Sequence, residues 1–273
     1  MHRVHLTILN SMAGKDFEQA LDIHLQWGLR YLDLKDEIFG KQVEQLTPAE
    51  AAQAARLIES RRLTTHTLST SIFCADIEEG EAAFRNRFAE ALERIINTAR
   101  ILRPHVIRLL AAKSSRRAEF SNAADYISAK HPWVYEIYGT AIDRLTRAGC
   151  NVAIENETRQ CIFAHPGEIA DFFIALGRPV RLIWDIANLW RAGTFPTVEV
   201  YTELKPLIGL VHVKGGRAVK PCGELSEASS LADASWDVSG ILRAILRDGM
   251  IDVLCLNPAH GTKNERYSGS TTD

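Results

Sequence analysis

The chain has 273 residues, of which 46% are hydrophobic and 24% charged, and its formal net charge is −2. This composition is typical of a globular protein with a large core, and the slight acidity argues against a nucleic-acid partner. There is no run of about 18 apolar residues and no signal-peptide pattern, so we expect a cytoplasmic protein with no membrane partner. The five cysteines form no CxxC pair, which predicts reduced thiols.

Apolar patterns predict strands that alternate with helices along the chain. Short apolar or β-branched runs predict eight strands, at residues 4–9, 30–34, 63–71, 105–110, 152–154, 182–185, 210–213 and 253–256. Helical spacing of apolar residues predicts seven helices, at residues 16–29, 47–60, 79–102, 132–148, 165–176, 196–207 and 236–247.

This alternation, without an obvious linker, predicts an α/β fold: one (β/α)8 TIM-barrel domain spanning residues 1–273. A doubly wound sheet is the alternative, but no GxGxxG turn follows the first strand. After Asn257 only the polar segment PAHGTKNERYSGSTTD remains, so the eighth helix is expected to be short or missing. Either another subunit covers the open wall, which predicts a homo-oligomer, or the chain is truncated.

Four neighbouring predicted strands end in polar side chains, which are Glu155, Asp185, His212 and Asn257. Side chains alternate across a strand, so the flanking apolar residues can face the helices while these four point into the barrel at its C-terminal mouth. Two carboxylates, an imidazole and an amide oxygen suit a divalent Mn, Mg, Co or Zn ion. Lys214 shares a face with His212 and is a candidate cation for a sugar oxyanion or phosphate.

The segments GLRYLDLKD, VAIENE, WDIAN, VHVKGG and LNPAHG occur in this order along the chain. The ordered set resembles the xylose isomerase-like barrel superfamily of sugar isomerases and epimerases, as far as about Gly261. The resemblance implies one divalent metal on Glu155, Asp185, His212 and the position of Asn257. It also implies two glutamates that move protons on opposite faces of a sugar.

The sequence departs from that pattern at two positions. Asn257 stands where the second glutamate is expected, and Asn188 stands where a histidine is common. An amide cannot act as a carboxylate base, which argues against symmetrical two-base epimerisation. A one-base isomerisation or elimination by Glu155 stays open, as does a loss of catalysis.

Other residues are candidate substrate contacts, namely His66, Arg108, Glu157, Asn188, Trp190 and His260. Each has a structural alternative. Arg108 could form an ion pair with Glu155 or Asp185 inside the barrel. His66 could be a buried, hydrogen-bonded histidine, and Trp190 could pack against helices. His260 could instead replace a missing metal ligand.

The leading hypothesis is a metal-dependent isomerase or epimerase of a small sugar or polyol ketone. Glu155 would be ligand and base, and Lys214 would stabilise developing negative charge. A dehydratase of a keto-polyol needs only one base and is the second hypothesis. A non-catalytic sugar-binding barrel is the third. An abasic-site endonuclease is disfavoured, because few strand ends carry histidine and the acidic balance suits DNA poorly.

Overall fold

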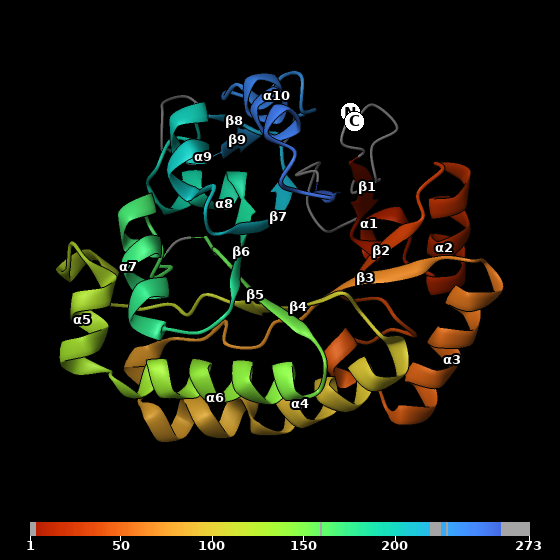
Figure 1. Cartoon of the computed structure of the whole chain (residues 1–273), viewed down its shortest axis with the longest axis horizontal. Coiled ribbons are helices and arrows are strands. Elements are labelled where there is room, and N and C mark those ends of the chain that lie inside the picture. The colour runs from red at the N-terminus through yellow and green to blue at the C-terminus, as the bar shows by residue number, and fades with distance from the viewer. Residues whose placement is uncertain (1–3, 159, 219–224, 228, 258–273) are drawn as a thin grey trace.

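The computed structural model describes residues 4–158, 160–218, 225–227 and 229–257. Its centre is a sheet of eight parallel strands. They are β1 (His5–Ile8), β2 (Tyr31–Leu34), β3 (Thr64–Ser69), β4 (Val106–Leu110), β5 (Asn151–Glu155), β6 (Arg181–Asp185), β7 (Ile208–Val213) and β10 (Val253–Leu256). The strand order is β1-β10-β7-β6-β5-β4-β3-β2, and a bridge between Leu9 and Asp33 joins the two ends. The sheet therefore closes into a TIM barrel (Figure 1).

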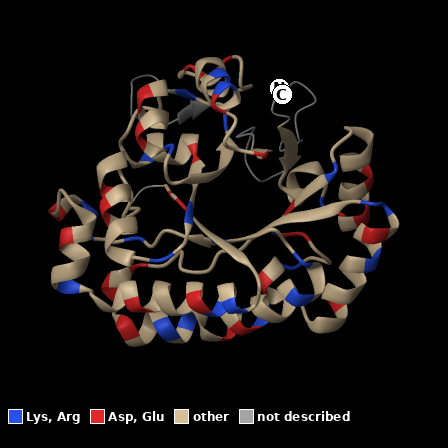
Figure 2. Cartoon of the chain, viewed as in Figure 1, with Lys and Arg blue, Asp and Glu red and all other residues tan. Residues whose placement is uncertain are grey.

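The helices that connect the strands surround this barrel. The seven predicted ones are α2 (Phe17–Gln26), α3 (Pro48–Ser60), α4 (Glu81–Leu102), α6 (Trp133–Arg147), α7 (Pro166–Leu176), α9 (Val198–Leu204) and α10 (Val238–Asp248). Charged residues are concentrated on these helices, whereas most of the barrel strands carry few (Figure 2). None of the helices in the described ranges is both long and apolar enough to cross a bilayer.

Short elements that the sequence did not predict lie in the connections between strands. They are the helices α1 (Asn10–Ala13), α5 (Ala123–Lys130) and α8 (Ile186–Ala192), the 3-10 turns η1 (Val43–Gln45), η2 (Ile77–Glu79) and η3 (Arg117–Glu119), and the hairpin of β8 (Arg217–Ala218) and β9 (Leu225–Glu227). All of them lie between the C-terminal end of a strand and the next predicted helix, on the side where TIM barrels build their sites. Both η3 and α5 precede α6 within the β4–β5 connection.

The barrel interior shows the predicted alternation of side chains. Ala153, Ile183, Leu210 and Val253 form a separate buried cluster. Their neighbours along the strands belong to the larger core shared with the helices. Trp184 is one of these: it is fully buried and stacks on Tyr201 of α9 at 6.2 Å between ring centroids. The strand ends therefore present alternate residues to the barrel mouth, as the sequence predicted.

The strands β1 and β10, which flank the wall that the sequence predicts to be partly open, are paired with each other. The two strands pair over four residues, from His5–Val253 to Ile8–Leu256. The two strands therefore satisfy each other's backbone edges, and Leu6 on β1 is 44% exposed. The expected short or missing eighth helix and His260 fall in residues 258–273, outside the described residues. Homo-oligomerisation stays a prediction.

Helix α3 begins with a reciprocal cap. The Thr47 side chain accepts a hydrogen bond from the Glu50 backbone N–H, and the Glu50 carboxylate accepts one from the Thr47 N–H at 2.9 Å. Thr47→Ala should therefore lower the free energy of unfolding by about 1 kcal/mol in urea titrations. Ser60→Ala, at the exposed end of the same helix, is the control and should change it by less than about 0.5 kcal/mol. Equal effects would contradict this role of the cap.

Candidate metal and substrate site

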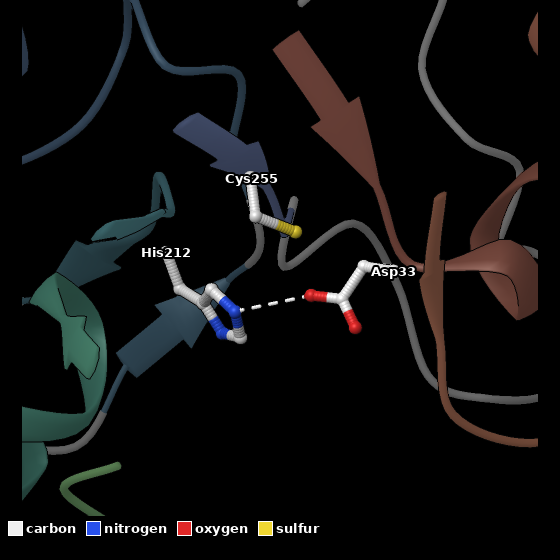
Figure 3. Close-up of side chains that lie close together, drawn as sticks. All are labelled: Asp33, His212 and Cys255. Atoms are coloured by element: carbon white, nitrogen blue, oxygen red, sulfur yellow. Dashed lines mark ion pairs between the residues drawn. The ribbon is translucent and has the colours of Figure 1, made fainter. Parts of the chain in front are cut away.

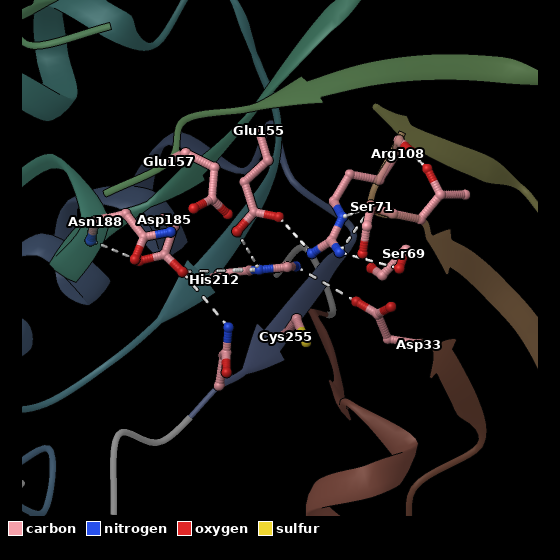
Figure 4. Close-up of polar contacts among 12 residues, drawn as sticks. Asp33, Ser69, Ser71, Arg108, Glu155, Glu157, Asp185, Asn188, His212 and Cys255 are labelled. Carbon is pink, nitrogen blue, oxygen red and sulfur yellow. Dashed lines mark hydrogen bonds and ion pairs between the residues drawn. The ribbon is translucent and has the colours of Figure 1, made fainter. Parts of the chain in front are cut away.

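Three strands deliver Glu155, Asp185 and His212 to one point at the C-terminal mouth (Figure 4). Nδ1 of His212 lies 3.0 Å from Oε1 of Glu155 and 4.0 Å from Oδ2 of Asp185. All three side chains are buried, with at most 2% exposure. The structure thus brings together the three residues that the sequence singled out as metal ligands, and their role as ligands stays a prediction.

The strand register explains this convergence. Asp185 and His212 are partners across β6 and β7, so their side chains leave the sheet at the same level. Asn156 fixes the end of β6, because its side-chain amide donates to the Asp185 carbonyl at 2.9 Å and its oxygen accepts from the Asp185 N–H at 2.8 Å. The sequence analysis gave Asn156 no role. The sequence signal for such a role was the position of Asn156 between Glu155 and Glu157, at the end of a predicted strand.

Arg108 anchors Glu155 from inside the barrel. Its Nη1 lies 2.6 Å from Oε2 of Glu155, and both side chains are buried. The guanidinium also donates to the backbone carbonyls of Ser69 and Thr70. Burial opposes ionisation of Glu155, but His212 and Arg108 outweigh it and hold the pKa of this carboxyl below its usual value. Glu155 is therefore ionised at neutral pH, and the ion pair predicted as its structural alternative is present.

Asp185 is held on the opposite side of the site. Lys214 lies 2.6 Å from its Oδ2, and the side-chain amide of Asn257 donates to the same oxygen at 3.5 Å. Burial is the largest influence and raises the pKa of Asp185, although Lys214 opposes it. Asn188 accepts a long hydrogen bond from Lys214 at 3.4 Å, and its backbone N–H donates to Asp185. These predicted residues therefore form one network around Asp185.

Asp33 is a fourth strand-end residue that the sequence analysis did not connect with the site. It is fully buried at the end of β2, and its Oδ2 lies 3.4 Å from Nε2 of His212. The rule applied to Glu155, that a carboxylate ending a buried strand needs a partner, would have found it.

The buried charges balance within the site. Three carboxylates face two basic side chains and one imidazole; these groups are Asp33, Glu155, Asp185, Arg108, Lys214 and His212. Burial alone would lower the pKa of His212, but the neighbouring carboxylates outweigh it and raise the pKa well above its usual value. A proton on His212 completes the balance of charge, so a bound cation would displace that proton.

Comparison with known proteins places the fold but gives no close relative. No protein-family model matches the sequence, and a search of curated proteins finds no match. Among solved structures, the IolI protein with a bound zinc atom has a TM-score of 0.74 at 13% identity, covering 97% of this chain and 92% of that one. The probable 3-DHS dehydratase AsbF of Bacillus anthracis has a TM-score of 0.73 at 13% identity, covering 97% and 96%. A D-psicose 3-epimerase studied with D-fructose has a TM-score of 0.67 at 16% identity, covering 97% and 89%.

The fold is that of the xylose isomerase-like barrels. The sequence motifs predicted this, and the structural matches confirm it over nearly the whole chain. At these identities the likeness establishes the fold alone, and the zinc and the sugar belong to the proteins compared.

The donor set at the mouth of this TIM barrel fits a divalent ion. Neighbouring ligands of a tetrahedral ion with bonds of about 2.0–2.1 Å lie about 3.3 Å apart. The distances from Nδ1 of His212, 3.0 Å to Glu155 and 4.0 Å to Asp185, bracket that value. The ligand atoms of the three residues all lie within 4.8 Å of one another. Arg108 and Lys214 are close enough to repel a cation, which lowers the expected affinity.

Two predicted substrate contacts differ in their position relative to this site: Trp190 lies in the core, and Glu157 lies near the mouth. Trp190 is 1% exposed and packs against Phe195 and Trp236, because the loop after β6 forms α8 and turns the ring into the core. Glu157 is partly exposed near the mouth, and its carboxylate lies 3.8 Å from Nζ of Lys113. The geometry of Trp190 thus favours its structural alternative, whereas Glu157 keeps an accessible carboxylate.

His66 lies at the opposite end of the barrel from the mouth. It lines a cavity of about 840 Å³ together with residues from the N-terminal halves of the strands, among them His5, Thr64 and Asn151. Its Nδ1 is 2.8 Å from the Thr67 hydroxyl, and its ring stacks on His105. The prediction that His66 contacts a substrate at the mouth does not agree with this position. The error arose because Thr64–Ser69 is long enough to span the barrel.

The buried position of His66 has a measurable consequence for acid stability. Burial lowers the pKa of His66 from 6.5 to about 4 in the folded protein. His66 is therefore protonated below pH 6.5 in the unfolded chain but only below about pH 4 in the folded chain. The folded state consequently loses stability as pH falls through this window. His66→Gln should reduce the loss in free energy of unfolding between pH 6.5 and pH 4 by up to about 3 kcal/mol, measured by urea unfolding at several pH values. A loss as large as in the wild type would contradict the prediction.

Proposed function

We propose that this protein is a divalent-metal-dependent isomerase or epimerase of a small sugar or polyol ketone. The observation that carries the proposal is the convergence of Glu155, Asp185 and His212 at the mouth of a xylose isomerase-like barrel. The solved structures with this fold include a zinc-bound protein and a sugar epimerase, which supports the proposal by analogy.

The proposed roles follow from the contacts of each side chain. Glu155, Asp185 and His212 would bind the ion, and Asn257 would lie at the fourth ligand position. A bound divalent ion polarises a carbonyl oxygen and so makes the adjacent C–H more acidic. Glu155 would accept that proton, because the neighbouring cations keep its carboxylate ionised. Its lowered pKa makes it a weak base, so the reaction depends on a strongly acidified carbon.

Lys214 would stabilise negative charge that develops on the substrate oxygen. Its ammonium group is part buried and rests on Asp185 and Asn188, which fix its position. A preorganised cation in a site that excludes water stabilises an oxyanion strongly. Arg108, Asn188 and Glu157 are the remaining proposed substrate contacts, with Arg108 acting through Glu155.

The experiment is proton exchange in heavy water. The protein, loaded in turn with Mn²⁺, Mg²⁺, Co²⁺ or Zn²⁺, is incubated with a panel of ketoses and keto-polyols and followed by NMR. The proposal expects deuterium at the carbon next to the carbonyl, with loss of exchange after chelation of the metal. No exchange with any metal and any member of the panel would overturn the proposal.

A dehydratase is the second candidate, and two observations favour it. Asn257 supplies an amide where a second carboxylate base would be needed for two-base epimerisation, and the AsbF structure matches this chain over 97% of its length. The same NMR experiment separates the two, because elimination removes a carbon-bound hydroxyl and isomerisation retains all of them. Thermal stabilisation by a sugar without exchange or elimination would instead support a non-catalytic sugar-binding barrel.

A further inference from the structure

A second group of ligand-type side chains lies on the other side of His212. Asp33 on β2, His212 on β7 and Cys255 on β10 point toward one another (Figure 3). All three are completely buried, and their ligand atoms lie within 4.8 Å of one another. Cys255 and His212 are register partners, so the thiol and the ring leave neighbouring strands at one level. None of the motifs that carried the proposed function includes Cys255.

Several polar atoms in this group are buried without a hydrogen bond. Both carboxylate oxygens of Asp33 and Nε2 of His212 have no partner with hydrogen-bond geometry, although Oδ2 and Nε2 are 3.4 Å apart. The thiol of Cys255 makes a long contact, 3.6 Å, to the backbone carbonyl of Leu256. The buried carboxylate of Asp33 faces the His212 ring without good hydrogen-bond geometry, so it is incompletely satisfied and the position favours a cation.

We propose that Asp33, His212 and Cys255 form a binding site for a thiophilic divalent cation such as Zn²⁺. In tetrahedral coordination with bonds of about 2.0–2.1 Å, a nitrogen and an oxygen ligand lie about 3.3 Å apart. The separation of 3.4 Å between Nε2 of His212 and Oδ2 of Asp33 matches that value. The thiol and the imidazole lose their protons to solvent when the ion binds, and three protein ligands leave the fourth position open.

The donor atoms distinguish this site from the one at Glu155. Nδ1 of His212 faces Glu155, whereas Nε2 faces Asp33. The Glu155 set offers two carboxylates and an imidazole, which suit Mg²⁺ and Mn²⁺ as well as Zn²⁺. A thiolate favours softer ions, Zn²⁺ among them. A neutral imidazole binds one ion, so zinc on Cys255 would compete with a harder ion on Glu155 for His212. The inference does not depend on the proposed reaction.

The test uses Co²⁺ as a spectroscopic probe of the full-length protein. A thiolate ligand gives an intense sulfur-to-cobalt charge-transfer band in the near ultraviolet. We expect this band in the wild type, its complete loss in Cys255→Ser, and its retention in Cys161→Ser, a control at another buried cysteine. Cys255→Ala serves in its place if circular dichroism shows Cys255→Ser to be unfolded.

The outcomes separate this site from the proposed function. Retention of the band in Glu155→Gln is expected, because Glu155 is not a donor to this ion. No band in cobalt-loaded wild type, or a band that survives in Cys255→Ser and Cys255→Ala, would overturn the inference and show a hydrogen-bonded core triad only. Metal-dependent deuterium exchange without a thiolate band would support the proposed function and refute this site. The reverse result would support this site and refute the proposed function.

Discussion

Arg108→Met is expected to lower the free energy of unfolding by about 3–5 kcal/mol. The substitution keeps most of the apolar volume but leaves the carboxylate of Glu155 buried with one cationic neighbour fewer. It also removes the donors to the backbone carbonyls of Ser69 and Thr70 at the end of β3. Urea unfolding of the metal-free protein at neutral pH measures the loss.

Two further variants show whether the Arg108–Glu155 pair is the cause. Arg85→Met removes an exposed i,i+4 pair with Glu81 and should cost less than about 1 kcal/mol. The double variant Arg108→Met/Glu155→Met should lose clearly less than the sum of the two single variants, because it leaves no unpaired charge between these positions. If Arg108→Met lowered the free energy of unfolding by no more than Arg85→Met does, the buried pair would contribute little to stability.

Glu155→Gln is expected to lower turnover by about 10²–10⁴-fold in the metal-loaded protein. Glutamine has the shape of glutamate, so Arg108 still has an oxygen to donate to, but the amide accepts no proton and binds a cation weakly. Metal content, measured by elemental analysis after gel filtration, should fall together with turnover. Thermal stability should change far less than in Arg108→Met.

Glu157→Gln is the matched control, because it makes the same chemical change two residues along the chain. Its carboxylate faces Lys113 and is not among the residues that converge on His212. This variant should keep its bound metal, and its effect should fall on KM rather than on metal content. Wild-type turnover and metal content in Glu155→Gln would refute the role proposed for Glu155.

The site could be predicted on one side of the barrel and was missed on the other. Glu155, Asp185 and His212 each follow an apolar run. The face of the strand on which each side chain lies could therefore be read from the sequence, without long-range information. Asp33 obeys the same rule, but its partner is 179 positions away on β7, and nothing local to YLDL indicates a histidine there. Cys255 was missed because a cysteine inside an apolar strand reads as core.

The positions of His66 and Trp190 could not be fixed from the sequence, and the physical causes are identifiable. The strand that carries His66 has six residues and spans the barrel. The alternation of side chains fixes the face of the strand on which His66 lies, but not the end of the barrel at which it lies. Trp190 lies in a loop that becomes helical because Asp185 caps α8, and seven residues are too few to show helical periodicity. The long helices and the barrel strands were predictable because each buries a regular apolar face against the other layer.

The most direct test of a metal at the barrel mouth is a crystal structure of the protein soaked in Mn²⁺, with anomalous diffraction data. We expect an anomalous peak within bonding distance of Glu155, Asp185 and Nδ1 of His212. A map with no anomalous peak between Glu155 and Asp185, or with its strong peak at another place in the protein, would contradict a metal site at the barrel mouth.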